Sequence, residues 1–146
     1  MSIDFQPRDV VNIIGFNAPE WNFSDFGTMA AGGVSAGVYA TNNAEACKYI
    51  SIHSKAKVVV VDGNKQLEKY AAIANELPDL KAIVFYGTEK VEEELKGKVS
   101  IPIYTFSEFQ ELGKNVSDAD LKARVDAQKP NQICTLIYTS GTTGEN

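Results

Sequence analysis

Residues 133 to 144 read ICTLIYTSGTTG, and this stretch joins a strand-like run to a loop of small residues. The run from Ile133 to Tyr138 is apolar and rich in β-branched residues, which predicts a buried strand. The loop behind it consists only of glycine and hydroxyl residues: Thr139, Ser140, Gly141, Thr142, Thr143 and Gly144. Such a loop can offer backbone N–H groups and hydroxyls to a phosphate. It is not a Walker A loop, because no lysine follows and its glycines lie three residues apart.

Apolar runs of strand length alternate with amphipathic stretches of helix length along the rest of the chain. The predicted strands cover residues 10–16, 38–40, 57–61, 81–86, 101–106 and 133–138. The predicted helices cover residues 19–31, 44–54 and 65–77, followed by a short charged segment at 89–98 and two further helices before residue 128. This alternation predicts an α/β fold with a doubly wound, mainly parallel sheet. Ligands of such sheets bind beyond the carboxyl ends of the strands, where the loop after Tyr138 lies.

Local signals predict where the helices begin and which side of each is buried. The predicted N-caps are Asn17, the segment Thr41 to Asn43, Thr105 and Ser117. Thr105 and Ser117 each have an acidic residue three positions later, Glu108 and Asp120, as in a capping box. Gly32, Gly33 and Gly37 are expected to break the first helix. Helical spacing predicts one apolar face with Ala46, Tyr49, Ile50 and His53, and another with Leu67, Tyr70, Ile73, Ala74 and Leu77.

Composition bounds the class of protein. The 146 residues are 44% hydrophobic and 23% charged, which is typical of one globular domain. The net charge of −5 argues against an extended nucleic-acid surface, because those surfaces are usually basic. The first nine residues carry no signal peptide, and Met29 to Ala40 is too short an apolar stretch to span a bilayer.

Several residues that can carry chemistry have a simpler structural interpretation. Cys47 and Cys134 show no metal-binding spacing, and we expect both to be small buried side chains. His53, the only histidine, is interpreted as a surface or half-buried structural residue, and Trp21 as part of the core. The acidic run at residues 92–94 is expected to be solvated.

The segment Tyr138 to Gly144 resembles the phosphate-binding signature of the adenylate-forming (AMP-binding) superfamily, which includes acyl-CoA synthetases, luciferases and the adenylation domains of peptide synthetases. Other segments are similar to long-chain fatty acyl-CoA synthetases, in particular to their bubblegum-type branch. These segments are residues 12–21, Gly32-Gly33, residues 37–39, residues 66–69 and residues 130–132. The resemblance implies a partial N-terminal AMP-binding domain, with residues 1–9 as a leader, 10–132 as βα repeats, and 133–146 as a strand plus phosphate loop.

The resemblance also implies an activity. Such enzymes join a fatty acid to coenzyme A through an acyl-adenylate, using ATP and Mg²⁺. It assigns phosphate binding to Thr139, Ser140, Gly141, Thr142, Thr143 and Gly144. It marks no residue of this chain as catalytic and none as a metal ligand. It implies a protein of the cytoplasm or of the periphery of intracellular membranes, with no nucleic-acid partner.

The chain departs from the family pattern where Glu145 and Asn146 stand in place of a proline and a lysine. Family members are several-fold longer, so we expect the 146 residues alone not to catalyse ligation. Three alternatives remain open at this stage. The chain could be a nucleotide-binding module without chemistry, an interaction module that pairs its terminal strand with another chain, or part of an adenylating enzyme for a different carboxylic acid.

Overall fold

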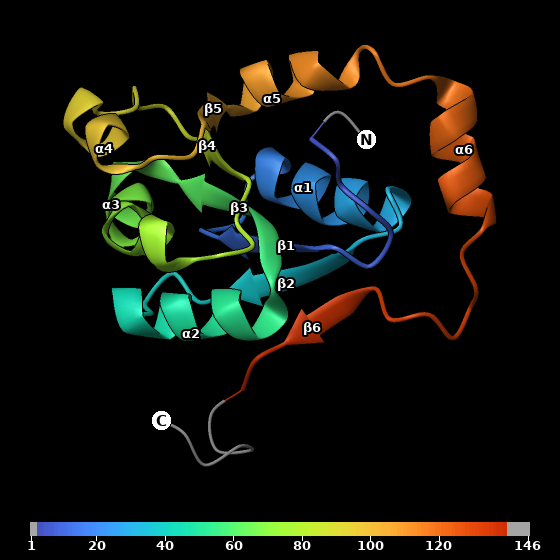
Figure 1. Ribbon diagram of the computed structural model, residues 1–146, viewed down its shortest axis with the longest axis horizontal. Coiled ribbons are helices and arrows are strands. Elements are labelled where there is room, and N and C mark those ends of the chain that lie inside the picture. The colour runs from blue at the N-terminus through green and yellow to red at the C-terminus, as the bar shows by residue number, and fades with distance from the viewer. Residues whose placement is uncertain (1–2, 140–146) are drawn as a thin grey trace.

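A computed structural model describes residues 3–139. Its strands are β1 (Val10–Ile14), β2 (Val34–Val38), β3 (Ala56–Asp62), β4 (Ala82–Tyr86), β5 (Ile103–Thr105) and β6 (Thr135–Ile137). They form one six-stranded sheet in the order β5-β4-β3-β1-β2-β6, and every neighbouring pair is parallel (Figure 1). The predicted α/β fold with a parallel sheet is therefore confirmed.

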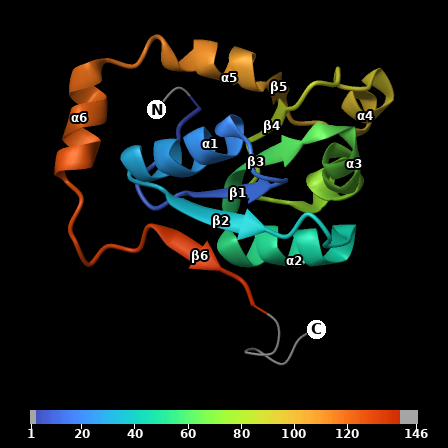
Figure 2. The ribbon, with the colours of Figure 1, turned by 180° about the vertical axis from the view of Figure 1, so that it is seen from behind.

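Helices cover both faces of this sheet. They are α1 (Pro19–Ala30), α2 (Ala44–Ser54), α3 (Gly63–Ile73), α4 (Glu93–Lys98), α5 (Phe106–Gly113) and α6 (Asp118–Asp126), with a 3-10 turn, η1 (Ala74–Glu76), after α3. One core cluster joins α2, α3 and α4 to the sheet, and a second cluster joins α1 and α5 to the opposite face. The view from behind in Figure 2 shows α1 and α2 on opposite sides of β1 and β2.

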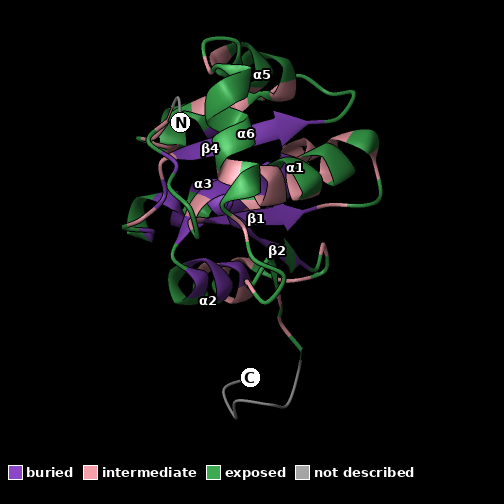
Figure 3. Ribbon diagram, turned by 90° about the vertical axis from the view of Figure 1, so that its right-hand side faces the viewer, coloured by how far each residue is buried: buried purple, intermediate pink, exposed green. Residues whose placement is uncertain are grey.

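Strand β3 shows why the sequence forms this layered core. Val59 and Val61 belong to the cluster under α2 and α3, whereas Val58 and Val60 belong to the cluster under α1 and α5. Successive side chains of a strand point to opposite faces, so an unbroken run of valines fills both cores. Strands β1 and β4 on either side of β3 are buried throughout (Figure 3).

Two boundary predictions near the first helix are wrong. The N-cap of α1 is Ala18, not Asn17, and no side chain caps this helix, because alanine has no side-chain acceptor. Pro19 at its first position leaves one N–H fewer to satisfy. The second strand spans Val34–Val38 rather than residues 38–40, with Gly37 inside it. Glycine was interpreted as a breaker there, but the pairing with β1 and β6 overrides that local preference.

The predicted face of α2 is also wrong. Its buried residues are Cys47, Ile50, Ser51 and Ser54, while Tyr49 and His53 face outward. Two serines lie on the buried side because they join a polar network in the core, so apolar spacing alone misplaced the face. The face predicted for α3 is confirmed, since all five of its named residues are buried.

Other local predictions are confirmed. Asn43 caps α2 by accepting a hydrogen bond from the Ala46 N–H, at 2.9 Å. Thr105 and Glu108 form the predicted capping box of α5, and Ser117 caps α6. Trp21 packs against the core cluster under α1. The acidic residues 92–94 are exposed, as expected.

Strand β6 differs most from its prediction. It is an edge strand that pairs only with β2, and Ile137 is 78% exposed. The prediction of a buried strand at residues 133–138 is therefore wrong, because the sheet ends at β6 and one of its faces is uncovered. Cys134 is exposed as well, whereas Cys47 is buried as expected.

Candidate functional site

The parallel sheet offers two places where a ligand could meet the carboxyl ends of its strands. The first is the switch point between β1 and β3, where the chain runs through α1 towards one side of the sheet and through α3 towards the other. Open α/β sheets commonly bind ligands in such a crevice. The second place is the end of β6, where the sequence predicts the phosphate loop.

The switch point is closed by the protein's own side chains. The Asp62 carboxylate accepts a hydrogen bond from the Phe16 N–H at 3.2 Å, and the Tyr86 hydroxyl donates to the Phe16 carbonyl at 3.4 Å. A Cβ atom at Gly15 would collide with both Asp62 and Tyr86, so only glycine fits there. Burial and the nearby Asp62 carboxylate raise the pKa of Tyr86, which keeps its hydroxyl protonated as a donor. At this switch point the Asp62 and Tyr86 side chains are therefore bonded to the protein's own backbone.

The N-terminus of α3 beside this crevice is also satisfied internally. The Glu89 carboxylate accepts a hydrogen bond from the Asn64 N–H at 3.0 Å. The Asn64 side chain in turn donates to the Lys90 carbonyl and accepts from the Glu92 N–H. A carboxylate thus occupies the position at which a helix N-terminus would hold an external anion.

The end of β6 is held by an aromatic contact with α2. The Nδ1 atom of His53 and the hydroxyl oxygen of Tyr138 lie 2.9 Å apart, so one group donates a hydrogen bond to the other. Their rings meet edge to face, and the Tyr49 ring stacks on His53, with centroids 5.7 Å apart in both pairs. Burial raises the pKa of Tyr138, and the Ser54 hydroxyl opposes that rise. The side chains of Leu136 and Tyr138 pack against the core on the α2 side of the sheet.

A buried polar network fixes α2 beneath this contact. Asn12 on β1 is fully buried, accepts a hydrogen bond from the Ser51 hydroxyl at 2.8 Å and donates to the Ser54 hydroxyl at 3.2 Å. The Tyr70 hydroxyl of α3 lies 3.4 Å from Ser51. Because buried polar groups must pair with one another, this network fixes how α2 is rotated against the sheet. His53 lies between the two serines in sequence and faces outward.

The predicted phosphate-binding residues begin where this contact ends. Thr139 is exposed directly beyond Tyr138. Ser140, Gly141, Thr142, Thr143 and Gly144 lie outside the described residues. Among residues 3–139, no group of three His, Cys, Asp or Glu side chains could hold a metal ion. No helix of the described part of the chain is long and apolar enough to cross a membrane.

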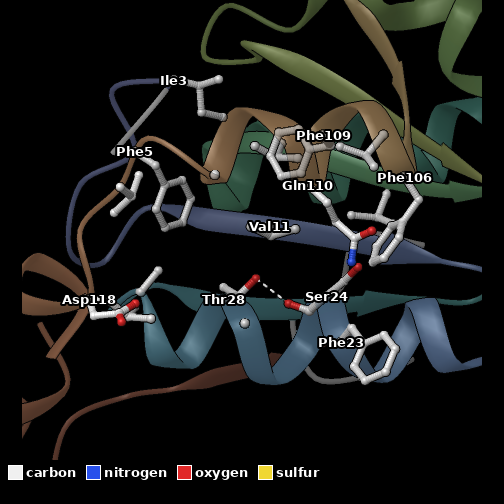
Figure 4. A pocket seen from close by; sticks show the side chains of 18 of the residues that line it. Ile3, Phe5, Val11, Phe23, Ser24, Thr28, Phe106, Phe109, Gln110 and Asp118 are labelled. Carbon is white, nitrogen blue, oxygen red and sulfur yellow. Dashed lines mark hydrogen bonds between the residues drawn. The ribbon is translucent and has the colours of Figure 1, made fainter.

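An apolar groove of about 450 Å³ lies on the opposite face of the sheet from α2. Its floor includes Val11 of β1, and Phe23 of α1 and Phe109 of α5 stand on its two sides (Figure 4). The Thr28 hydroxyl at its edge is already used, because it donates to the Ser24 carbonyl at 2.6 Å. This groove has the chemistry for apolar contacts rather than for a phosphate.

Sequence reasoning missed the partners of His53. The interpretation of His53 as a surface residue is confirmed, but its contact with Tyr138 joins residues 85 positions apart. Periodicity reports only which residues share a face, so no local signal could reveal this pair. The closure of the switch point by Asp62 and Tyr86 was missed for the same reason.

Comparison with known proteins adds a family match and close relatives. The family model described as AMP-binding enzyme matches residues 1–146. Long-chain-fatty-acid–CoA ligase ACSBG2 of Xenopus laevis is 47% identical over 135 residues, and ACSBG1 is 50% identical in Mus musculus and 49% in Homo sapiens, each over 134 residues. Each match covers 92% of this chain but 18% of the relative, so the chain spans about a fifth of their length.

Solved structures share the fold at lower identity. Coronafacic acid ligase from Pectobacterium brasiliense superposes with a TM-score of 0.73 at 15% identity, covering 94% of this chain and 25% of that one. The anthranilate CoA ligase AuaEII, in complex with anthranoyl-AMP, gives 0.66 at 22% identity, covering 96% and 24%. A luciferase-like enzyme from Zophobas morio gives 0.64 at 16% identity, covering 97% and 29%.

Proposed function

This chain belongs to the AMP-binding enzyme family, and from that premise we propose that it forms part of a long-chain fatty acid–CoA ligase. The observation that carries the proposal is the identity of 47 to 50% to relatives named as such ligases, over 92% of this chain. The likeness to bubblegum-type synthetases expected from the sequence is confirmed by these relatives. Membership of the family implies the use of ATP.

The proposed reaction has two steps. In the first, a fatty-acid carboxylate oxygen bonds to the α-phosphorus of ATP, and pyrophosphate leaves with the electron pair of the broken P–O bond. In the second, the sulfur of coenzyme A, having lost its proton, bonds to the carbonyl carbon of the acyl-adenylate. The bond from that carbon to the phosphate oxygen breaks, and AMP leaves with its electron pair. The products are acyl-CoA, AMP and pyrophosphate.

The role proposed for this chain is to hold phosphate groups at the end of β6. Donors fixed before the reaction stabilise charge that develops on a leaving group, and fixed placement favours in-line attack. The backbone N–H groups and hydroxyls of Thr139 to Gly144 have the donor chemistry for this role. Magnesium, when bound to the nucleotide, would neutralise part of the phosphate charge. In this proposal, residues 1–9 are a leader, residues 10–132 are βα repeats, and residues 133–146 are the strand and the phosphate loop.

A chimera tests the proposal directly. This chain replaces the corresponding segment of the Mus musculus ligase, and acyl-CoA and AMP are measured with ATP, coenzyme A and long-chain fatty acids. We expect acyl-CoA formation by the chimera and its loss in Gly141→Val, because the added side chain would prevent close approach of backbone to phosphate. Gly97→Val is the matched control, since nothing lies within 4 Å of a Cβ at Gly97.

A folded chimera without ligase activity towards any long-chain acid would contradict the proposal. Activity only with a shorter, aromatic or amino acid would favour another adenylating enzyme. The 146 residues alone are expected to form no acyl-CoA, since they cover about a fifth of the relatives' length. If the chimera is inactive but the 146-residue chain binds ATP, and Gly141→Val abolishes that binding, a nucleotide-binding module is favoured.

The exposed edge of β6 favours one further candidate, an interaction module. Unpaired strand edges invite pairing with another chain, and Ile133 and Ile137 are both exposed there. Light scattering tests it: self-association that disappears in Ile137→Lys would support this reading, and a monomer at all concentrations would count against it.

A further inference from the structure

The best-defined contact next to the predicted phosphate loop is the pair formed by His53 and Tyr138. Strand β6 has only three residues and one neighbouring strand, so its ladder with β2 holds it weakly. Just beyond Ile137, the Tyr138 hydroxyl forms a hydrogen bond with His53 at 2.9 Å, and this bond fixes the chain there. Whatever orients Tyr138 therefore orients the residue that follows it, Thr139.

His53 is supported by contacts on two sides. Its ring is stacked by Tyr49 from the preceding turn of α2 and meets the Tyr138 ring edge to face. Helix α2 itself is tied to the central strand by the buried bonds of Asn12 with Ser51 and Ser54. A continuous set of contacts thus leads from β1 in the centre of the sheet, through α2, to the end of β6.

We propose that His53 is a positioning residue, which holds Tyr138 and thereby sets the direction in which the chain leaves β6 towards the predicted phosphate loop. The effect of this contact on catalysis rests on the proposed function, whereas the contact itself does not. His53 touches no reacting group in this account. Its part is to fix the direction of the chain at Thr139 before the nucleotide arrives, so that less ordering is needed at the time of binding.

The first measurement follows the contact in the 146-residue chain without nucleotide. His53 is the only histidine, so its ring nitrogen resonances in ¹⁵N NMR belong to one residue. Tyr138→Phe should shift them. His53→Phe should lower hydrogen-exchange protection of the β6 amides that pair with β2 by roughly tenfold, because loss of one ordinary hydrogen bond loosens the end of this short strand. His53→Asn, which keeps a polar atom near the position of Nδ1, should restore most of that protection.

Matched controls separate the contact from general damage to α2. Ile52→Ala alters an exposed neighbour on the same helix and should leave exchange of the β6 amides unchanged. The double variant His53→Phe with Tyr138→Phe should lose no more protection than either single variant, because both remove the same bond. Unchanged ring resonances in Tyr138→Phe, or unchanged protection in His53→Phe, would overturn the proposal.

The second measurement uses the chimera described above. His53→Phe should raise the KM for ATP several-fold with a smaller change in kcat, and His53→Asn should restore it. An active chimera whose KM for ATP is the same in His53→Phe would overturn the positioning role. An unsubstituted chimera that makes no acyl-CoA would count against the proposed function instead, while the exchange measurement would still decide the contact.

Discussion

Ile13 in β1 and Ile137 in β6 flank the same residue, Gly37 of β2, and point to the same face of the sheet. Ile13 is 0% exposed and Ile137 is 78% exposed. One residue type at one level of the sheet therefore has two different surroundings. The centre of the sheet provides the stability of the fold, whereas the edge carries the segment to which we assign phosphate binding.

The largest effect expected from this comparison is on stability. Ile13→Ala should lower the free energy of unfolding by about 2–5 kcal/mol, because it leaves a cavity between packed side chains. Ile137→Ala should change it by less than about 0.5 kcal/mol, as for an ordinary surface residue. Urea unfolding of the two variants measures both values. Equal losses would show that the edge is as important for stability as the centre.

The next effect concerns the buried network that ties β1 to α2. Asn12→Leu removes the partner of the Ser51 and Ser54 hydroxyls and should cost about 1–3 kcal/mol of unfolding free energy. Replacing both serines by alanine in the same variant should recover part of this loss, since no hydroxyl is then left unpaired. Urea unfolding again provides the measurement. A triple variant less stable than Asn12→Leu would contradict the network's role.

The smallest expected effect is on the pKa of a carboxylate at the other edge of the sheet, where β5 lies. Strand β5 leads into α5 through a capping box, in which bonds from the Thr105 N–H and hydroxyl lower the pKa of Glu108 from its ordinary 4.5. Because the folded pKa is depressed, this contribution to stability is complete above pH 4.5 and is lost as the pH falls through the folded value. Thr105→Val removes the hydroxyl bond but keeps the N–H bond, so NMR titration should show the Glu108 pKa rising only part of the way towards 4.5. A pKa that does not rise in this variant would show that the hydroxyl bond does not contribute to its depression.

These two edges also explain what the sequence could and could not predict. The capping box lies within four consecutive residues, so its pattern was readable and is confirmed. The apolar run at 133–138 was equally clear, but a strand's place in the sheet depends on pairing across about 100 residues, between Gly37 and Ile137. Burial was therefore predicted for an edge strand. The same limit hid the pair of His53 and Tyr138.

The candidate site shows a similar division. The match of Tyr138 to Gly144 to a family signature indicated the site, because glycines and hydroxyls in that order have few other uses directly after a strand. The sequence did not reveal how the strand ends meet at the switch point between β1 and β3. Asp62 and Tyr86 form hydrogen bonds to the Phe16 backbone there, which only their three-dimensional arrangement reveals.

The most direct test of the central claim compares two threonines of the same short segment. In the chimera, Thr139→Val should lower kcat/KM for ATP roughly tenfold or more, because a donor beside the phosphates is lost. Thr135→Val, also exposed but within β6, should leave it unchanged, and neither variant should alter the stability of the 146-residue chain by more than about 0.5 kcal/mol. If the two variants have the same kcat/KM for ATP, the end of β6 is not the phosphate-binding part of this chain.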